Sequence, residues 1–77
     1  MDYKTRIELN PDIMLGKPVI KGTRLTVETV LTKLSQGANV EDLLRAYSNI
    51  SKEDIYACFQ YASALIANEE TIILKAS

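Results

Sequence analysis

The sequence predicts a mainly α fold, in which three helices follow a short N-terminal β segment. Two observations carry this prediction. Residues 3–9 alternate polar and apolar side chains, as a half-buried strand does. From Val27 onward the apolar residues recur at spacings of three and four, and Thr26, Asn39 and Ser51 each stand where a helix could begin.

The length and composition indicate a single small domain, residues 1–77. The chain has 77 residues, 47% of them apolar, which is too apolar for a disordered chain. A core of this size supplies only about 3–5 kcal/mol, so we expect a homodimer, a higher oligomer or a constant partner. The single Cys58 allows no internal disulfide, no secretory signal opens the sequence, and no apolar run approaches the ~20 residues that span a bilayer. We therefore expect a cytoplasmic protein without membrane contact.

The N-terminal segment is expected to form a small hairpin or two short strands. Asn10, Pro11 and Asp12 predict a turn, because Asn and Asp tolerate turn geometry and Pro presets it. Four apolar residues that flank the next glycines are expected to pack beneath the following loop, and they are Ile13, Leu15, Val19 and Ile20.

The first two helices are bounded by capping and stop signals. Thr26 predicts the start of the first helix, and Gly37 predicts its end. Asn39 predicts the cap of a second helix, from Val40 to about Tyr47, after which a tight connector follows.

The third helix is predicted to be the longest. Ser51 and Asp54 resemble a capping box, with Asp in place of the usual Glu, and the helix is expected to end near Asn68. Its predicted core-facing stripe consists of Ile55, Cys58, Phe59, Ala62, Leu65 and Ile66. The tail beyond it, Thr71–Leu74, has the composition of an extended strand without a partner inside the chain.

The loop Gly16–Arg24 concentrates two glycines, one proline and three basic side chains in nine residues. A nucleotide-binding loop is excluded, because Gly16-Lys17 is followed by Pro18 and not by the Ser or Thr that opens a helix in that motif. Two interpretations stay open. The loop could present its cations to phosphate or carboxylate groups, or it could only turn the chain into the first helix.

Catalysis is not expected. The sequence has no histidine, the commonest general base and a frequent metal ligand. Cys58 stands within an apolar stripe, where a buried, inert thiol is expected. Six of the ten carboxylates form three adjacent pairs, Glu41-Asp42, Glu53-Asp54 and Glu69-Glu70. Neighbours in a helix point about 100° apart, so a pair cannot easily share a proton or a metal ion. We expect neither a cofactor nor a metal.

The predicted order of a helix, a short helix, a tight turn and a long helix is typical of a helix-turn-helix unit, of homeodomain-like or winged type. Residues 40–47 would be its first element and residues 52–67 its recognition helix. The net charge of −1 argues against a strongly basic DNA-binding protein, although residues 1–24 carry five cations against three acids. Glu53 and Asp54 would repel phosphate. A three-helix core that binds no DNA is the competing interpretation. The candidate DNA-binding residues are Lys17, Lys21, Thr23, Arg24, Lys52, Tyr56 and Gln60.

The loop and the helices together resemble the DUF433 family. The resemblance rests on the string Gly16–Arg24, on Thr26-Val27, on Glu41–Leu44 with Tyr47, and on Ile50–Ile55, and it covers about residues 5–66. It leaves the tail 67–77 outside. It implies a small prokaryotic protein with a helix-turn-helix-like core, often dimeric and often encoded beside a PIN-like ribonuclease, whose antitoxin it is taken to be. It brings no catalytic residues.

We therefore expect an antitoxin-like protein of a type II toxin–antitoxin pair. It would neutralise a PIN-like toxin by direct binding, and a dimer could also bind its own promoter DNA. The candidate partner-binding residues form the apolar tail, which could add to the edge of a partner's sheet or fill a groove, and they are Thr71, Ile72, Ile73, Leu74 and Lys75. The alternatives are a dimeric scaffold or regulatory subunit that binds no DNA, and an orphan helix-turn-helix transcriptional regulator.

Overall fold

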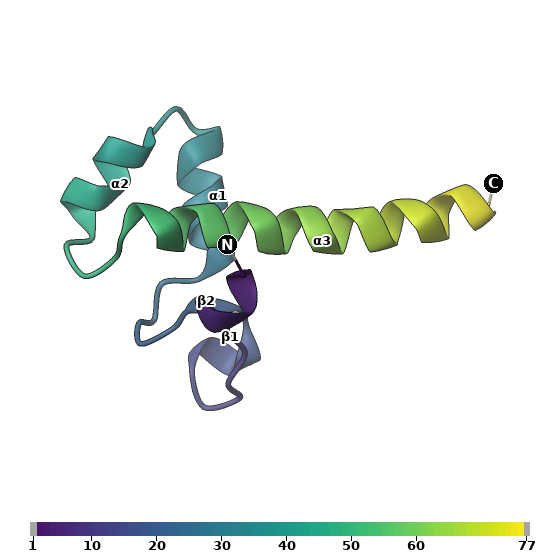
Figure 1. Cartoon of the computed structure of the whole chain (residues 1–77), viewed down its shortest axis with the longest axis horizontal. Helices are drawn as coiled ribbons and strands as arrows, with labels where there is room; N and C mark the ends of the chain where they lie inside the picture. Colours follow the sequence, from purple (N-terminus) through teal and green to yellow (C-terminus); the bar gives the residue numbers. More distant parts are fainter. Residues whose placement is uncertain (1, 77) are drawn as a thin grey trace.

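The three predicted helices are present in the computed structural model, which describes the backbone of residues 2–76 and the side chains of residues 2–68. Helix α1 spans Val27–Ser35, α2 spans Val40–Ala46 and α3 spans Lys52–Ala76. The helices α1 and α2 pack beside the first half of α3, and the N-terminal segment covers another side of that half (Figure 1). The prediction of a mainly α fold with a short N-terminal β segment is confirmed.

The β segment is shorter than predicted. Strand β1, Ile7–Glu8, pairs antiparallel with β2, Val19–Ile20, so that Ile7 lies opposite Ile20. The strand expected over residues 3–9 is wrong for its first half, because Tyr3–Thr5 forms a 3-10 turn (η1). The cause is local: the carboxylate of Asp2 accepts a hydrogen bond from the backbone N–H of Lys4 at 2.9 Å and caps that turn.

The loop between the strands contains a left-handed turn. Met14, Leu15 and Gly16 have φ values of 49°, 59° and 82°, and they form a second 3-10 segment, η2, Met14–Gly16. Val19 and Ile20 are buried as predicted, but Leu15 is 94% exposed. The prediction that Leu15 packs beneath the loop is therefore wrong, because the left-handed backbone points its side chain away from the protein.

Each helix begins where the capping signals predict. The hydroxyl of Thr26 accepts the backbone N–H of Thr29 at 3.0 Å, and Asn39 forms a reciprocal capping box with Asp42. The chain leaves α1 through Gly37, whose φ of 105° suits only glycine. Every residue that begins a helix is thus held by a hydrogen bond within its own segment.

A single apolar core joins β1, β2 and the three helices. Its buried members include Ile20 from β2, Val30 from α1, Leu43 from α2, and Ile55 and Cys58 from α3. All five are at most 1% exposed, so the first half of α3 is the wall against which the other elements pack.

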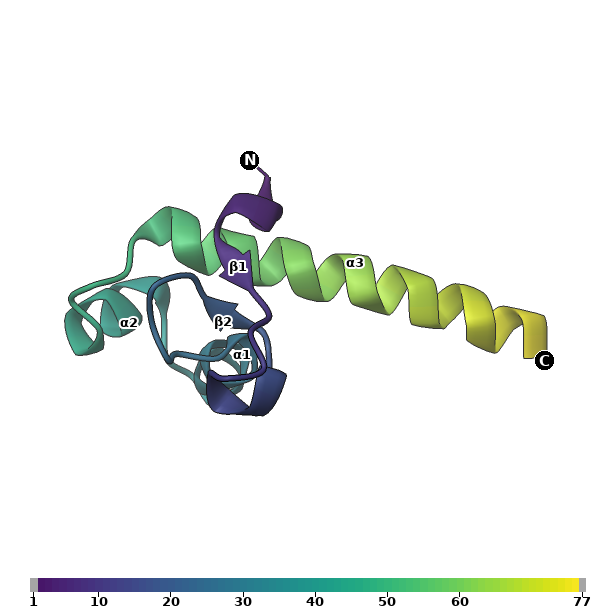
Figure 2. The same ribbon diagram turned by 90° about the horizontal axis from the view of Figure 1, so that it is seen from below.

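Helix α3 is longer than predicted. It continues past Asn68 to Ala76, so the prediction of an extended, strand-like tail is wrong. The sequence offers no Gly or Pro that would stop the helix, and extending an existing helix costs far less than starting one. The second half projects from the compact part as a single rod (Figures 1 and 2). The side chains of the partner-binding set, residues 71–75, lie outside the described residues.

The carboxylate of Asp54 connects the N-terminal segment to α3. One oxygen, Oδ2, accepts the backbone N–H of Ser51 at 2.9 Å and completes the capping box of α3. The other, Oδ1, lies 3.1 Å from Nη1 of Arg6, the residue that precedes β1. The Asp54 side chain is only 15% exposed, so this ion pair is better shielded from water than a surface pair.

We expect Asp54→Ala to lower the free energy of unfolding by about 2–3 kcal/mol, because it removes both a cap and a shielded ion pair. Asp42→Ala is the matched control. Asp42 occupies the same capping position in α2 and pairs with Arg45 on its own helix, at an exposed site. Its loss should cost about 1 kcal/mol. Urea denaturation measures both values, and equal losses would contradict a tertiary role for Asp54.

Candidate functional site

The turn from β2 into α1 is held by the hydroxyl of Thr23. That hydroxyl donates to the carbonyl oxygen of Ile20 at 2.7 Å and accepts the backbone N–H of Leu25 at 3.0 Å. Gly22 has a φ of 81°, as the turn requires. Thr23, a candidate DNA-binding residue, therefore uses its side chain within the turn.

All three loop cations are exposed, but only Lys17 makes an ion pair among the residues whose side chains are described. Lys21 and Arg24 make no ion pair within residues 2–68, the part of the chain whose side chains are described. The loop is also connected to the start of α3, because the backbone N–H of Lys21 donates to the carbonyl oxygen of Arg6 at 2.8 Å and Arg6 pairs with Asp54. Lys21 thus lies on the side of the molecule where α3 begins, and Arg24 follows it in the same turn, so these two exposed cations are taken together as a basic surface.

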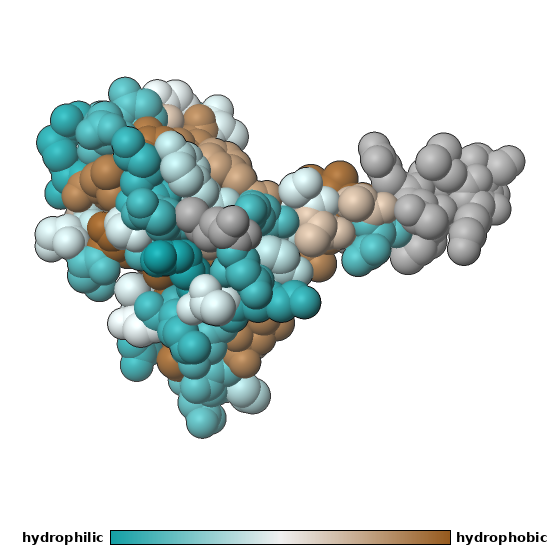
Figure 3. Space-filling view, in the orientation of Figure 1, coloured by the Kyte–Doolittle hydropathy of each residue, from teal (hydrophilic) through white to brown (hydrophobic). Residues whose placement is uncertain are grey.

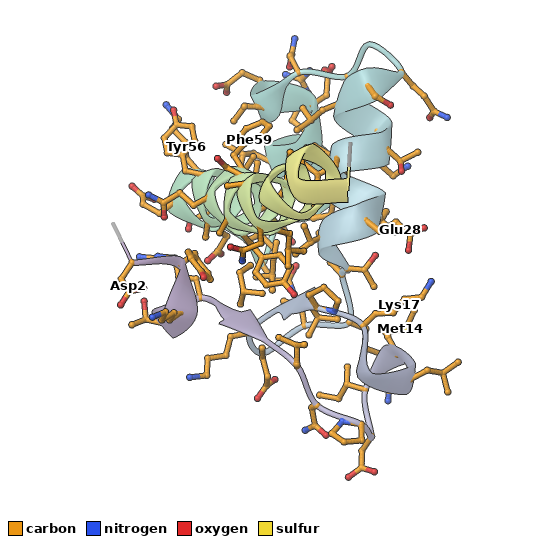
Figure 4. The ribbon with its side chains drawn as sticks, turned by 90° about the vertical axis from the view of Figure 1, so that its right-hand side faces the viewer. Asp2, Met14, Lys17, Glu28, Tyr56 and Phe59 are labelled. Carbon is orange, nitrogen blue, oxygen red and sulfur yellow. The ribbon has the colours of Figure 1, made fainter. Side chains whose placement is uncertain are left out.

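Lys17 does not belong to that basic surface. Its Nζ lies 3.0 Å from Oε1 of Glu28, in the first turn of α1, so its charge is largely balanced. Figure 4 looks along α3 and shows Lys17, Glu28 and Met14 on the side of the molecule away from Tyr56. The seven candidate DNA-binding residues therefore do not form one surface.

The remaining candidates share the outer face of α3. Lys52, Tyr56 and Gln60 are exposed and follow one another at intervals of four, so they lie along one side of the helix. Glu53 is exposed at the same end of the helix and adds a negative charge there. This face is polar and aromatic rather than basic.

The stripe predicted to face the core divides in the structure. Ile55 and Cys58 are buried, but Phe59, Leu65 and Ile66 are 44%, 47% and 57% exposed. The prediction is wrong for these three, for two reasons. Phe59 is turned about 100° from Cys58, and Leu65 and Ile66 belong neither to the buried core nor to the partly buried side chains packed against it. Figure 3 shows apolar side chains on the rod where it leaves the compact part.

A shallow hollow lies between η1 and the middle of α3. Tyr3 contributes to one wall, and the ring of Tyr3 also packs edge-on against Tyr61, with a centroid distance of 5.7 Å. The α3 side chains in the hollow are mostly small, and they are Phe59, Gln60, Ser63, Ala64 and Ala67. No sequence pattern indicates this hollow, because it depends on the 3-10 turn at η1.

The described residues show no arrangement that points to catalysis. No group of three metal-binding side chains is found among them. Burial raises the pKa of the Cys58 thiol to about 11, and the nearby carboxylate of Asp54 adds to that increase. Such a thiol carries almost no thiolate at neutral pH and is a poor nucleophile. No helix in the described part is long and apolar enough to cross a membrane.

The fold and the exposed surfaces define a small three-helix domain of helix-turn-helix type, with a projecting third helix. Residues 7–62 match the family described as "Protein of unknown function (DUF433)", and the chain belongs to this family. The resemblance of the loop and helices to DUF433 is thereby confirmed.

Two relatives support the assignment. The chain is 38% identical over 55 residues to "Uncharacterized protein y4eO" of Sinorhizobium fredii, a match that covers 71% of this chain but only 25% of that protein. The crystal structure of a DUF433 member protein from Anabaena variabilis has a TM-score of 0.75 and 30% identity, and the match covers 91% of this chain and 66% of that one. The fold is thus the same as in an experimentally determined member of the family.

The buried thiol makes stability depend on pH in the alkaline range. Above pH 9.0, its ordinary pKa, an unfolded Cys58 loses its proton while the folded thiol keeps it until about pH 11. The unfolded state then binds fewer protons, so the free energy of unfolding should fall by up to about 1.4 kcal/mol per pH unit in that window. Urea denaturation from pH 7 to 10.5 measures this. Cys58→Ala should lack this alkaline fall in the free energy of unfolding. If the free energy of unfolding of both proteins fell equally with pH, the role of the thiol would be contradicted.

Proposed function

We propose that this protein is a non-enzymatic, antitoxin-like protein that neutralises a PIN-like ribonuclease by direct binding in the cytoplasm. The observation that supports it most is the projecting half of α3. Single helices of fewer than about 12–15 residues are marginal in water without packing partners. A helical rod with exposed apolar residues therefore favours a protein whose work is contact with another protein.

The side of the rod that continues the core-facing stripe is the proposed toxin-binding side. Ile55, Cys58, Ala62 and Leu65 follow one another at spacings of three and four, and burial decreases along them until Leu65 is 47% exposed. An apolar stripe of this kind fits into a hydrophobic groove of a partner. The mode of binding proposed here is thus a helix in a groove, and strand addition is set aside.

A second candidate function is binding of promoter DNA. The protein would do this either as an antitoxin that also binds its own promoter or as an orphan transcriptional regulator. The succession of α2, a tight turn and α3 supports it, as does the exposed pair Lys21 and Arg24. The negative charge of Glu53 on α3 weighs against α3 as the helix that reads bases. We therefore assign the phosphate contact to the loop. A scaffold or regulatory subunit that binds neither toxin nor DNA remains the rival.

The first test is co-expression with the product of the adjoining reading frame, which we expect to be a PIN-like ribonuclease. Leu65→Glu should weaken the complex about 100-fold and restore growth arrest by the toxin, because a charge would enter the apolar groove. Leu9→Glu is the matched control, since Leu9 is 60% exposed but lies just after β1. Calorimetry measures the affinities. Full neutralisation by Leu65→Glu, or by a chain ending at Asn68, would contradict the proposed mode of binding.

The second test measures binding to the protein's own upstream DNA at several salt concentrations. The double substitution Lys21→Ala and Arg24→Ala should reduce the slope of log K against log salt by about 1.8, because two phosphate contacts are lost. Lys33→Ala, at an exposed cation in the last turn of α1, should leave the slope unchanged. Absence of any binding at low salt, by the protein alone or with its toxin, would end the DNA proposal.

A further inference from the structure

A second stripe runs along the outer face of α3, separate from the stripe assigned to the toxin. Tyr56, Phe59, Ser63 and Ile66 are all exposed, and they follow one another at spacings of three, four and three. This alternation is the heptad pattern with which two helices pack against each other. Ile66 is turned by about 100° from Leu65, so the two stripes lie on different sides of the rod.

We propose that this outer stripe binds the same stripe of a second copy of the chain, with the two α3 helices antiparallel. The proposal goes beyond the toxin-binding function, because it names a different partner and a different face of α3. The two-fold axis passes near Ser63, where small side chains allow the helices to approach closely.

The length of the projecting half of α3 and the position of the hollow favour a second α3 helix as the binding partner of the outer stripe. Residues 63–76 form about 21 Å of helix, and residues 52–63 form about 18 Å, so each projecting half matches the outer face of the other copy's first half. The hollow beside that face is edged by Tyr3 and floored by Ser63, Ala64 and Ala67. An antiparallel helix from the second copy would lie along this hollow.

The antiparallel direction follows from the shape of the molecule. The elements η1, α1 and α2 pack mainly around the first half of α3, whereas the end of the helix projects beyond them (Figures 1 and 2). In the antiparallel arrangement, each rod covers the first half of the other α3, and the compact parts lie at opposite ends. A parallel arrangement would crowd the compact parts together and leave both hollows empty. A stable dimer needs about 800 Å² from each copy, which the full length of two α3 helices can supply.

Sedimentation equilibrium of the full chain tests the self-association. We expect the wild type to be a dimer at about 10–100 µM protein. Ile66→Glu should raise the dimer Kd about 100-fold, because each copy places the new charge in the symmetric interface. Leu65→Glu is the matched control, since it is the adjacent residue with similar exposure, and it should change the Kd less than about 3-fold. Circular dichroism checks that both variants fold. A monomeric wild type, or equal effects of the two substitutions, would overturn the proposal.

Disulfide trapping tests the direction. In a Cys58→Ala background, mixed Gln60→Cys and Ala67→Cys chains should form a heterodimeric disulfide, because antiparallel pairing about Ser63 brings position 60 of one copy beside position 67 of the other. Each variant alone should cross-link at least about 10-fold more slowly, since its two cysteines lie about 10 Å apart along the helix axes. Faster cross-linking within each variant alone would indicate parallel helices and overturn the antiparallel arrangement.

Discussion

The carboxylate of Asp54 is the interaction on which the arrangement of this domain depends. It caps α3 through Ser51 and holds the N-terminal segment through Arg6 at 3.1 Å. Because Arg6 precedes β1, the same contact positions the strand pair, and through the N–H of Lys21 it positions the loop that carries the exposed cations. A small chain buries a small apolar core, so this ion pair between the N-terminal segment and the start of α3 adds a contact that the core does not supply.

The second constraint is that α3 is longer than the core that supports it. The elements η1, β1, α1 and α2 pack against α3 mainly along its first half, and the end of the helix projects beyond them (Figure 1). Such a helix has two apolar stripes to cover, one carrying Leu65 and the other carrying Phe59 and Ile66. A lone helical half gains little stability from hydrogen bonds alone, which supports the proposed role of this part of α3 in binding.

The helix starts could be predicted from the sequence because caps are local: Thr26, Asn39 and Ser51 each bond within three residues. The end of α3 could not, since no local stop signal exists there and strand-like composition at Thr71–Leu74 gives way to propagation of the helix. Several candidate DNA-binding residues are grouped because they are close in the sequence. In the structure, Lys17 pairs with Glu28 on the side of the molecule away from Tyr56. Contacts between distant residues, such as Arg6 with Asp54, leave no pattern in a single sequence.

Membership in DUF433 establishes the fold but no chemistry, so the proposed function depends on how the exposed surfaces are distributed. The basic pair Lys21 and Arg24 lies where α3 begins, and the apolar stripes lie where it projects. In the antiparallel dimer proposed above, the starts of the two α3 helices are about 33 Å apart along the helix axis, to which the lateral offset of the loops is added. Half-sites one turn apart on DNA are separated by about 34 Å. Such a dimer could therefore place two phosphate-binding loops on neighbouring half-sites while the stripe carrying Leu65 stays free for the toxin. In that arrangement the loops would contact the DNA, because Tyr56 on α3 would be covered by the second copy.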